Sequence, residues 1–330
     1  MASDDFKGAV VLVNGASTGL GRAIAVEVAG RGAEAVIVNF ARSADEAQET
    51  ARQVEARGAK AVLIQGDVAS DEDCRKIAAA AEPFGRIDAL FNNAGVTTFA
   101  PNHADLDAVS GEDFLRLYGV NVVGAFQMVR AARALLEAGP RAGAVVNTAS
   151  IAGVMGIGSS VPYAASKGAL TTMTISLARA LAPKIRVNAI CPGFIDTPWF
   201  GKGMPAERID RMREATAAST PLRAASTAED IAEAAVMLGA FAAYLKDKAR
   251  FLTAAQAAEL YHARYAETAS SYMLWEDTPT PPMNPDYAWS TPCGPWPKTF
   301  LFYDRFAQMM FIEGKVEPVA MLKEATVPYC

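Results

Sequence analysis

The sequence is poor in the residues that build metal sites and disulfide frameworks. Its 330 residues include only four cysteines and two histidines. The cysteines lie far apart without a C-x-x-C pair, and neither histidine has a neighbour at metal-ligand spacing. We therefore expect no metal centre and no disulfide scaffold, and we do not expect histidine to be the central proton carrier.

Long apolar runs and an excess of basic residues are also missing. No run reaches the roughly 18 residues of a membrane span. The first ten residues, MASDDFKGAV, do not combine a basic segment with an apolar one, so they predict no secretory signal. The net charge of −5 disfavours nucleic-acid binding. These absences predict a cytoplasmic protein without a membrane or nucleic-acid partner.

What the sequence does contain, up to about residue 240, is a regular alternation of short apolar segments with alanine-rich amphipathic ones. The apolar segments are continuous rather than alternating, which is typical of parallel strands covered on both faces. Strand–helix alternation predicts right-handed crossovers and a doubly wound, Rossmann-like α/β sheet of six to seven strands with helices on both faces. The six clearest strands are Ala9–Gly15, Ala33–Phe40, Lys60–Val68, Ile87–Gly95, Gly143–Ser150 and Ile185–Gly193.

A glycine-rich loop, NGASTGLG (Asn14–Gly21), joins the first predicted strand to the first helix. Glycine allows positive φ and close approach of the backbone to a ligand. The helix that begins there directs free N–H groups and a positive dipole end towards the loop. A loop in this position is typical of a dinucleotide phosphate site.

With this loop, the chain resembles the single-domain short-chain dehydrogenases/reductases. Their loop reads T-G-x-x-x-G-x-G, and Asn14 departs from the usual threonine. Six further motifs recur in order, and together the seven cover about 240 residues: Asp67-Val68, NNAG (Asn92–Gly95), Asn121 in GVNVVGAF, Ser150, the Y-x-x-x-K pair Tyr163 and Lys167, and the P-G segment of CPGFIDTP (Cys191–Pro198).

The resemblance implies a nicotinamide cofactor and a set of site residues. The implied catalytic residues are Asn121, Ser150, Tyr163 and Lys167. The implied cofactor-binding residues are Gly15, Ser17, Thr18, Gly19, Leu20, Gly21, Asn39, Arg42, Ser43, Asp67, Val68, Asn93, Ala94, Gly95, Tyr163, Lys167, Pro192, Gly193, Ile195 and Thr197.

The end of the second strand, VIVNFARS, bears on the choice of cofactor. Asn39 stands where an NAD enzyme would hold an aspartate for the ribose 2′-hydroxyl, and Arg42 and Ser43 follow as candidate partners of a 2′-phosphate. NADP(H) is therefore favoured over NAD(H), although Arg42 could also be an ordinary surface charge. Ser43 with Glu46 three residues later further predicts a capping box for the next helix.

The spacing of Tyr163 and Lys167 suggests a mechanism. An i, i+4 pair shares one helix face, and a lysine cation lowers the pKa of a nearby tyrosine. Tyr163 is then the general acid for ketone reduction or the base for alcohol oxidation, and Ser150 stabilises the substrate oxygen. The resemblance further implies that Lys167 holds the nicotinamide ribose and that Asn121 holds a water on the proton route.

The segments after the strands also predict the walls of a substrate pocket, at the strand ends where open α/β sheets bind ligands. They are mostly apolar, which favours a mainly apolar small molecule with a carbonyl or a secondary alcohol. For each of them, core packing is an equally good interpretation. The predicted walls are Thr97, Thr98, Phe99, Ile151, Met155, Ser159, Phe194, Trp199, Phe200 and Met204.

The resemblance fails after about residue 245. We divide the chain into residues 1–245, the dinucleotide-binding and catalytic domain, residues 246–305, a helix plus Trp/Pro-rich insertion as a lid or subunit contact, and residues 306–330, a displaced seventh strand and tail. The alternative is an unrelated extension behind a six-stranded sheet. The resemblance implies a homodimer or homotetramer. An NAD-dependent secondary-alcohol dehydrogenase and a catalytically silent dinucleotide-binding regulator remain alternatives.

Overall fold

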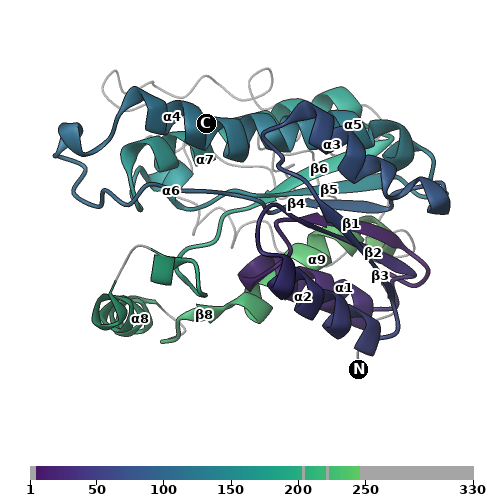
Figure 1. Cartoon of the computed structure of the whole chain (residues 1–330), viewed down its shortest axis with the longest axis horizontal. Helices are drawn as coiled ribbons and strands as arrows, with labels where there is room; N and C mark the ends of the chain where they lie inside the picture. Colours follow the sequence, from purple (N-terminus) through teal and green to yellow (C-terminus); the bar gives the residue numbers. More distant parts are fainter. Residues whose placement is uncertain (1–4, 203–204, 221–222, 246–330) are drawn as a thin grey trace, which may run out of the picture. The chain divides into compact units, whose positions relative to one another are not determined.

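The computed structural model describes residues 5–202, 205–220 and 223–245. Within these residues, the main sheet has six parallel strands in the order β3-β2-β1-β4-β5-β6, which confirms the doubly wound fold predicted from the sequence (Figure 1). The strands are β1 Val10–Asn14, β2 Ala35–Phe40, β3 Lys60–Gln65, β4 Ala89–Asn92, β5 Gly143–Thr148 and β6 Ile185–Ile190. The sequence had predicted each of these strands, with ends that differ by a few residues.

Helices connect the strands and cover both faces of the sheet (Figure 1). They are α1 Gly19–Gly30, α2 Ala44–Ala56, α3 Asp71–Ala79, α4 Gly111–Tyr118, α5 Ala125–Glu137, α6 Ala152–Met155, α7 Val161–Leu181, α8 Ala206–Ser219 and α9 Ala228–Leu245. A π-helix, Gly119–Gly124, joins α4 to α5, and short 3-10 turns occupy Glu82–Phe84, Leu106–Ala108 and Phe200–Lys202. Two-residue strands β7 (Ile195–Asp196) and β8 (Ser226–Thr227) form a separate parallel pair that the sequence did not predict.

The two faces of the sheet bury separate apolar cores, because neighbouring side chains of a strand point in opposite directions. Val11 and Val13 of β1 pack with α1 and α9. Val10 and Leu12 of the same strand pack with α3 and α5. This two-sided burial explains why the strands read as continuous apolar segments in the sequence.

The order of the strands places the ligand site. The chain runs from β1 to β2 and β3 in one direction and from β4 to β6 in the other, so the connections diverge between β1 and β4. A crevice opens at such a point, beyond the carboxyl ends of the strands. The loop after β1 and the segments after β4, β5 and β6 therefore meet there.

Two expectations concern other parts of the chain. The insertion predicted for residues 246–305 and the displaced strand predicted for residues 306–330 lie outside the described residues. Across the ranges that are described, each helix is too short or too polar to traverse a bilayer.

Candidate active site

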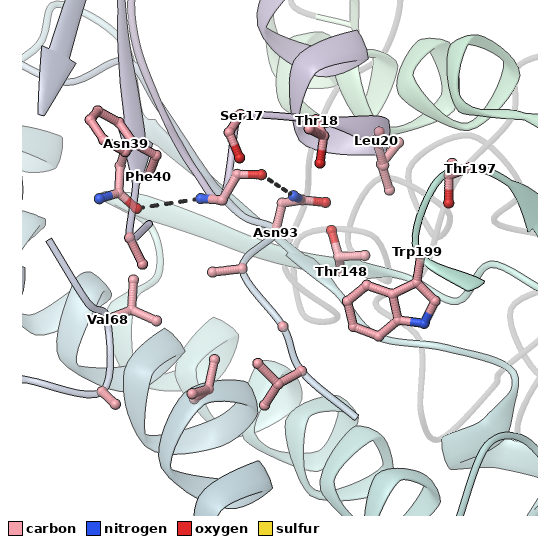
Figure 2. Close-up of a pocket in the computed structure, with 18 of the residues that line it drawn as sticks. Ser17, Thr18, Leu20, Asn39, Phe40, Val68, Asn93, Thr148, Thr197 and Trp199 are labelled. Carbon is pink, nitrogen blue, oxygen red and sulfur yellow. Dashed lines mark hydrogen bonds between the residues drawn. The ribbon is translucent and has the colours of Figure 1, made fainter. Parts of the chain in front are cut away.

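A cavity of about 770 Å³ lies along the carboxyl ends of the strands. One end is formed by Asn39, Phe40 and Val68, and the other by Thr148, Thr197 and Trp199 (Figure 2). The glycine loop, with Ser17, Thr18 and Leu20, lies between these two ends in the same view. The cavity brings together every predicted cofactor residue except Gly21.

The glycine loop approaches the segment after β4 very closely. Gly15 has a φ of +62°, and a Cβ atom there would lie 2.7 Å from Cα of Ala94. Gly19 has a φ of +55° and starts α1. Thr18, the N-cap of α1, makes no side-chain capping bond, and the first turn holds no acidic residue. The N–H groups of this helix end are thus left for an anion, such as a pyrophosphate.

Gly21 lies at a packing contact between α1 and the glycine loop. It does not line the cavity. A Cβ atom there would lie 2.2 Å from the carbonyl oxygen of Gly15 and 2.6 Å from Nδ2 of Asn93. Gly21 therefore permits close packing of α1 on its own loop, and its contact with the cofactor stays a prediction.

Asn39 is also used differently from the sequence interpretation. Its side chain is buried, with 1% exposed. Oδ1 accepts a hydrogen bond from the Gly15 N–H at 3.4 Å, and Nδ2 donates to the carbonyl oxygens of Ile64 and Gly66 (Figure 2 shows the first of these bonds). Asn39 thus braces the glycine loop against β3, and its Nδ2 is already engaged.

Arg42 and Ser43 lie at the same end of the cavity, beside the start of α2. The Arg42 guanidinium is exposed and makes no hydrogen bond or ion pair with any described residue. Ser43 is the N-cap of α2, but its side chain makes no capping bond, so the predicted capping box with Glu46 is wrong. Both polar side chains are therefore available to a ligand.

Helix α7 carries Tyr163 and Lys167. The buried Ser160 caps it by accepting a hydrogen bond from the N–H of Tyr163 at 3.3 Å, and Pro162 occupies its first turn, where proline is tolerated. The cap fixes where the helix begins. It therefore sets Tyr163 at the cavity wall and Lys167 one turn further along the helix.

Lys167 is buried, with 4% exposed, and its Nζ donates to the carbonyl oxygen of Thr148 at 2.6 Å. Burial lowers the pKa of Lys167 to about 8, because desolvation disfavours the cation. Nζ also lies 5.7 Å from the centroid of the Tyr163 ring. The ammonium is thus held between β5 and the tyrosine, with a pKa still above neutral pH.

The electrostatics of Tyr163 differ from the prediction. Burial raises the pKa of Tyr163 above its ordinary value, and the hydrogen-bonding Ser150 side chain acts in the opposite direction. Ser150 is itself held near the tyrosine, since its Oγ accepts from the Ala152 N–H at 3.1 Å and donates to the Pro192 carbonyl at 3.4 Å. The predicted cause was wrong, because Ser150 rather than Lys167 is the side chain that favours the phenolate.

Asn121 lies within the π-helix and is 1% exposed. Its Nδ2 donates to the Val96 carbonyl and to Oγ of Ser166, both at 3.0 Å, and its Oδ1 accepts from the Val96 N–H at 2.8 Å. Asn121 does not line the cavity. It joins the segment after β4 to α7, and one lone pair of Oδ1 remains for a further donor.

The predicted substrate walls are only partly brought to the cavity. Trp199 and Phe200 line it, and the other described members do not. The Trp199 ring lies 6.5 Å from that of Tyr163, and Phe200 lies 5.0 Å from Phe194 and 6.5 Å from Phe99.

The remaining predicted walls have other surroundings. Thr97 hydrogen-bonds Ser159 at 2.5 Å, and Thr98 donates to Asp113. Ile151 is partly exposed and Met155 is 65% exposed. Met204 lies outside the described residues.

Several cavity residues were missed by the sequence interpretation. Thr148 could have been found, since it is the last residue of β5 and lies just before the predicted Ser150. The others come from segments whose direction depends on the tertiary structure. The missed residues are Phe40, Ala41, Gly66, Ala69, Val96, Leu115, Arg116, Gly119, Val120, Thr148 and Ala149.

Comparison with known proteins gives one consistent family. A sequence model described as short chain dehydrogenase matches residues 9–207. A Streptomyces violaceoruber protein named as ketoacyl reductase 2 of the granaticin polyketide synthase is 39% identical, over 72% of this chain and 92% of that protein. A Bos taurus protein named 3-hydroxyacyl-CoA dehydrogenase type-2 is 35% identical, over 58% of this chain and 75% of that protein.

Solved structures agree with the sequence matches. The crystal structure of a short-chain dehydrogenase/reductase from Burkholderia xenovorans is similar with a TM-score of 0.63 and 38% identity. The similarity covers 70% of this chain and 90% of that one. It therefore extends over most of the related protein and leaves part of this chain unmatched.

Proposed function

Because the chain belongs to the short-chain dehydrogenase family of nicotinamide-dependent oxidoreductases, we propose that it is an NADP(H)-dependent carbonyl reductase or alcohol dehydrogenase. Its substrate is a mainly apolar small molecule with a ketone or secondary alcohol. One observation carries this proposal: the same cavity is lined by the uncapped N-terminus of α1 and by Tyr163, Ser150 and the buried Lys167.

The residues present fit a phosphorylated dinucleotide. Gly15 lets the loop pack directly on Ala94, Gly19 begins α1 with a positive φ, and α1 presents unpaired N–H groups. Arg42 and Ser43 would hold a 2′-phosphate, and no acidic side chain of β2 competes for that place. Lys167 and Thr197 would hold the nicotinamide half. When bound, the nicotinamide supplies or accepts the hydride.

The chain's own groups would handle the proton. A raised pKa keeps Tyr163 protonated at neutral pH, which suits a general acid that donates to a ketone oxygen. The Ser150 hydroxyl would donate a hydrogen bond to the same oxygen and stabilise its developing charge. Lys167 and Asn121 would carry the replacement proton towards Tyr163, with Asn121 accepting from a water through its remaining lone pair.

The proposal of an apolar substrate rests on the aromatic side chains beside Tyr163. Trp199 and Phe200 line the cavity and are supported by Phe194 and Phe99. Such a wall removes water from the substrate, and the gain grows with the apolar area buried. The name of the Streptomyces relative, a ketoacyl reductase, supports a ketone substrate, and that of the bovine relative, a dehydrogenase, keeps the oxidative direction as the second candidate.

The test is a panel of apolar ketones and secondary alcohols, assayed with NADPH and NADH or their oxidised forms. We expect turnover with NADPH at a kcat/KM well above that with NADH. Tyr163→Phe should lower kcat by at least about a thousandfold, since the positioned proton donor is lost. The dissociation constant for NADPH should stay within about twofold, because the phenol oxygen bears on proton transfer more than on cofactor affinity.

Two results would count against the proposal. Turnover by Tyr163→Phe at the wild-type rate would remove the tyrosine from its role. Binding of NADPH without turnover of any ketone or alcohol would favour the silent regulator.

A further inference from the structure

A row of buried carboxamides crosses the carboxyl end of the sheet. Asn14, Asn92 and Asn147 occupy paired positions on β1, β4 and β5 and are at most 4% exposed. Nδ2 of Asn14 donates to Oδ1 of Asn92 at 2.7 Å, and Nδ2 of Asn92 donates to Oδ1 of Asn147 at 2.9 Å. The hydrogen bonds therefore all run in one direction across three strands.

The two ends of this row reach the two halves of the candidate site. At one end, Oδ1 of Asn14 accepts from the N–H groups of Asn93 and Ala94, at 2.8 and 2.7 Å. Ala94 is the residue against which Gly15 of the cofactor loop packs. At the other end, Nδ2 of Asn147 donates at 2.9 Å to Oγ1 of Thr174 on α7.

Thr174 stands seven residues after Lys167, so both lie on the same face of α7. The row thus connects the backbone beside the glycine loop to the helix that carries Tyr163 and Lys167. A side branch runs from Asn92 Nδ2 to the Ala125 carbonyl at 3.3 Å, directly after the π-helix of Asn121.

Burying this row of carboxamides costs free energy unless each hydrogen bond along it is made. The preceding paired positions, Val13, Phe91 and Val146, are apolar and buried, as expected inside a sheet covered on both faces. Buried carboxamides in that setting require partners, and hydrogen bonds in series strengthen one another. Because each Nδ2 donates to the next residue, loss of one acceptor leaves a buried donor unpaired.

We propose that the Asn14–Asn92–Asn147–Thr174 row sets the position of the catalytic helix relative to the cofactor loop, which makes Asn14, Asn147 and Thr174 positioning residues for hydride transfer. None of the three lines the cavity. They act through the Asn93–Ala94 backbone at one end and through α7 at the other. The inference rests on the proposed function, since it concerns the alignment of that same site.

The experiment breaks the row at the end farther from the cofactor loop. Thr174→Val keeps the side-chain shape and leaves Nδ2 of Asn147 unpaired. We expect the NADPH dissociation constant to rise and kcat to fall, each by about three- to tenfold, which corresponds to part of the effect of one unsatisfied buried donor. The primary isotope effect on kcat with 4-deuterated NADPH should increase, because hydride transfer becomes slower.

A readout without cofactor tests the coupling directly. In the cofactor-free protein, the amide hydrogens of Asn93 and Ala94 should exchange faster in Thr174→Val than in the wild type. Thr171→Val is the matched control, since Thr171 lies on the same helix and, among the residues that the structure describes, its Oγ1 donates only to the Lys167 carbonyl. Its exchange at these two amides should equal that of the wild type. Thr174→Ser should restore wild-type values, because it keeps the hydroxyl.

One outcome overturns the proposal. If Thr174→Val lowers Tm but leaves exchange at Asn93 and Ala94, the NADPH dissociation constant and the isotope effect at wild-type values, the row only stabilises the fold. Failure of the proposed function would look different. In that case the wild-type protein would turn over no ketone or alcohol, while amide exchange would still report whether the row couples α7 to the loop.

Discussion

At the scale of single residues, Lys167 carries an electrostatic cost, because burial disfavours its charged form. Its ammonium is buried and has one close carbonyl partner, from Thr148. The lowered pKa of about 8 expresses that cost, because the unfolded chain holds the proton more tightly than the folded one. The free energy of unfolding should therefore increase as pH rises from about 8 to about 10, where the unfolded lysine is still protonated.

This pH dependence is testable with Lys167→Met, which removes the titrating group but keeps an unbranched chain. The difference in unfolding free energy between wild type and variant should grow by up to about 3 kcal/mol in favour of the wild type over that pH range. Denaturant unfolding at several pH values measures it, with pH kept below 10 so that tyrosine ionisation does not contribute. A pH-independent difference would show that Lys167 does not titrate there.

Arg42 decides the proposed preference for NADP(H). Arg42→Ala should raise KM for NADPH by about tenfold or more, the usual effect of losing a charge-assisted hydrogen bond, and leave KM for NADH unchanged. Arg52→Ala is the control, because Arg52 also lies on the α2 side and is exposed, with an ion pair to Glu49. Equal losses for both cofactors would remove the 2′-phosphate as the partner of Arg42.

The candidate site was predictable from sequence where chemistry depends on spacing along one element. The glycine loop, the Tyr163–Lys167 pair and the arginine after β2 belong to this class. The use of Asn39 and Asn147 could not be predicted, because the partners of a buried carboxamide come from strands far away in the sequence. The Tyr163 pKa was misjudged for a similar reason, since burial is a property of the assembled site.

At the scale of elements, α6 and α7 pack with almost no space between their backbones. A Cβ atom on Gly153 would lie 2.4 Å from the N atom of Gly168 and from the carbonyl carbon of Lys167. Gly153 and Gly168, which lack side chains, therefore let α6 approach the helix that carries the proposed catalytic pair. The strands and most helices were predictable from their periodicity. The contact between α6 and α7 was not, because the sequence of one helix does not indicate which other helix it packs against.

Gly153→Ala should separate α6 from α7 beside Lys167. We expect a loss of about 1–3 kcal/mol in the free energy of unfolding, typical of overpacking, and a lower kcat. Gly111→Ala is the control, because no atom lies within 4 Å of its Cβ position at the start of α4, and it should leave Tm unchanged or slightly higher. Unfolding curves for both variants measure this. Wild-type stability of Gly153→Ala would mean that α6 moves away without cost.

At the scale of the whole described fold, burial is unevenly distributed across the layers. The central strands β1 and β4 are buried at every position. Strand β3, at one edge of the sheet, is exposed at both ends and only partly buried between them, and α8 buries none of its residues. Free energies of local opening follow such differences, because an element with few buried contacts can open without unfolding the rest.

Native-state hydrogen exchange should therefore show a graded order. Amides of β1 and β4 should exchange only through global unfolding, with the steepest dependence on denaturant. Those of β3 should exchange through smaller openings, and those of α8 should exchange first, at rates nearly independent of denaturant. Mass spectrometry of peptides from each element can resolve the three classes. Protection of α8 equal to that of β1 would contradict this order, because it would require contacts for α8 that its exposed side chains do not make within the described ranges.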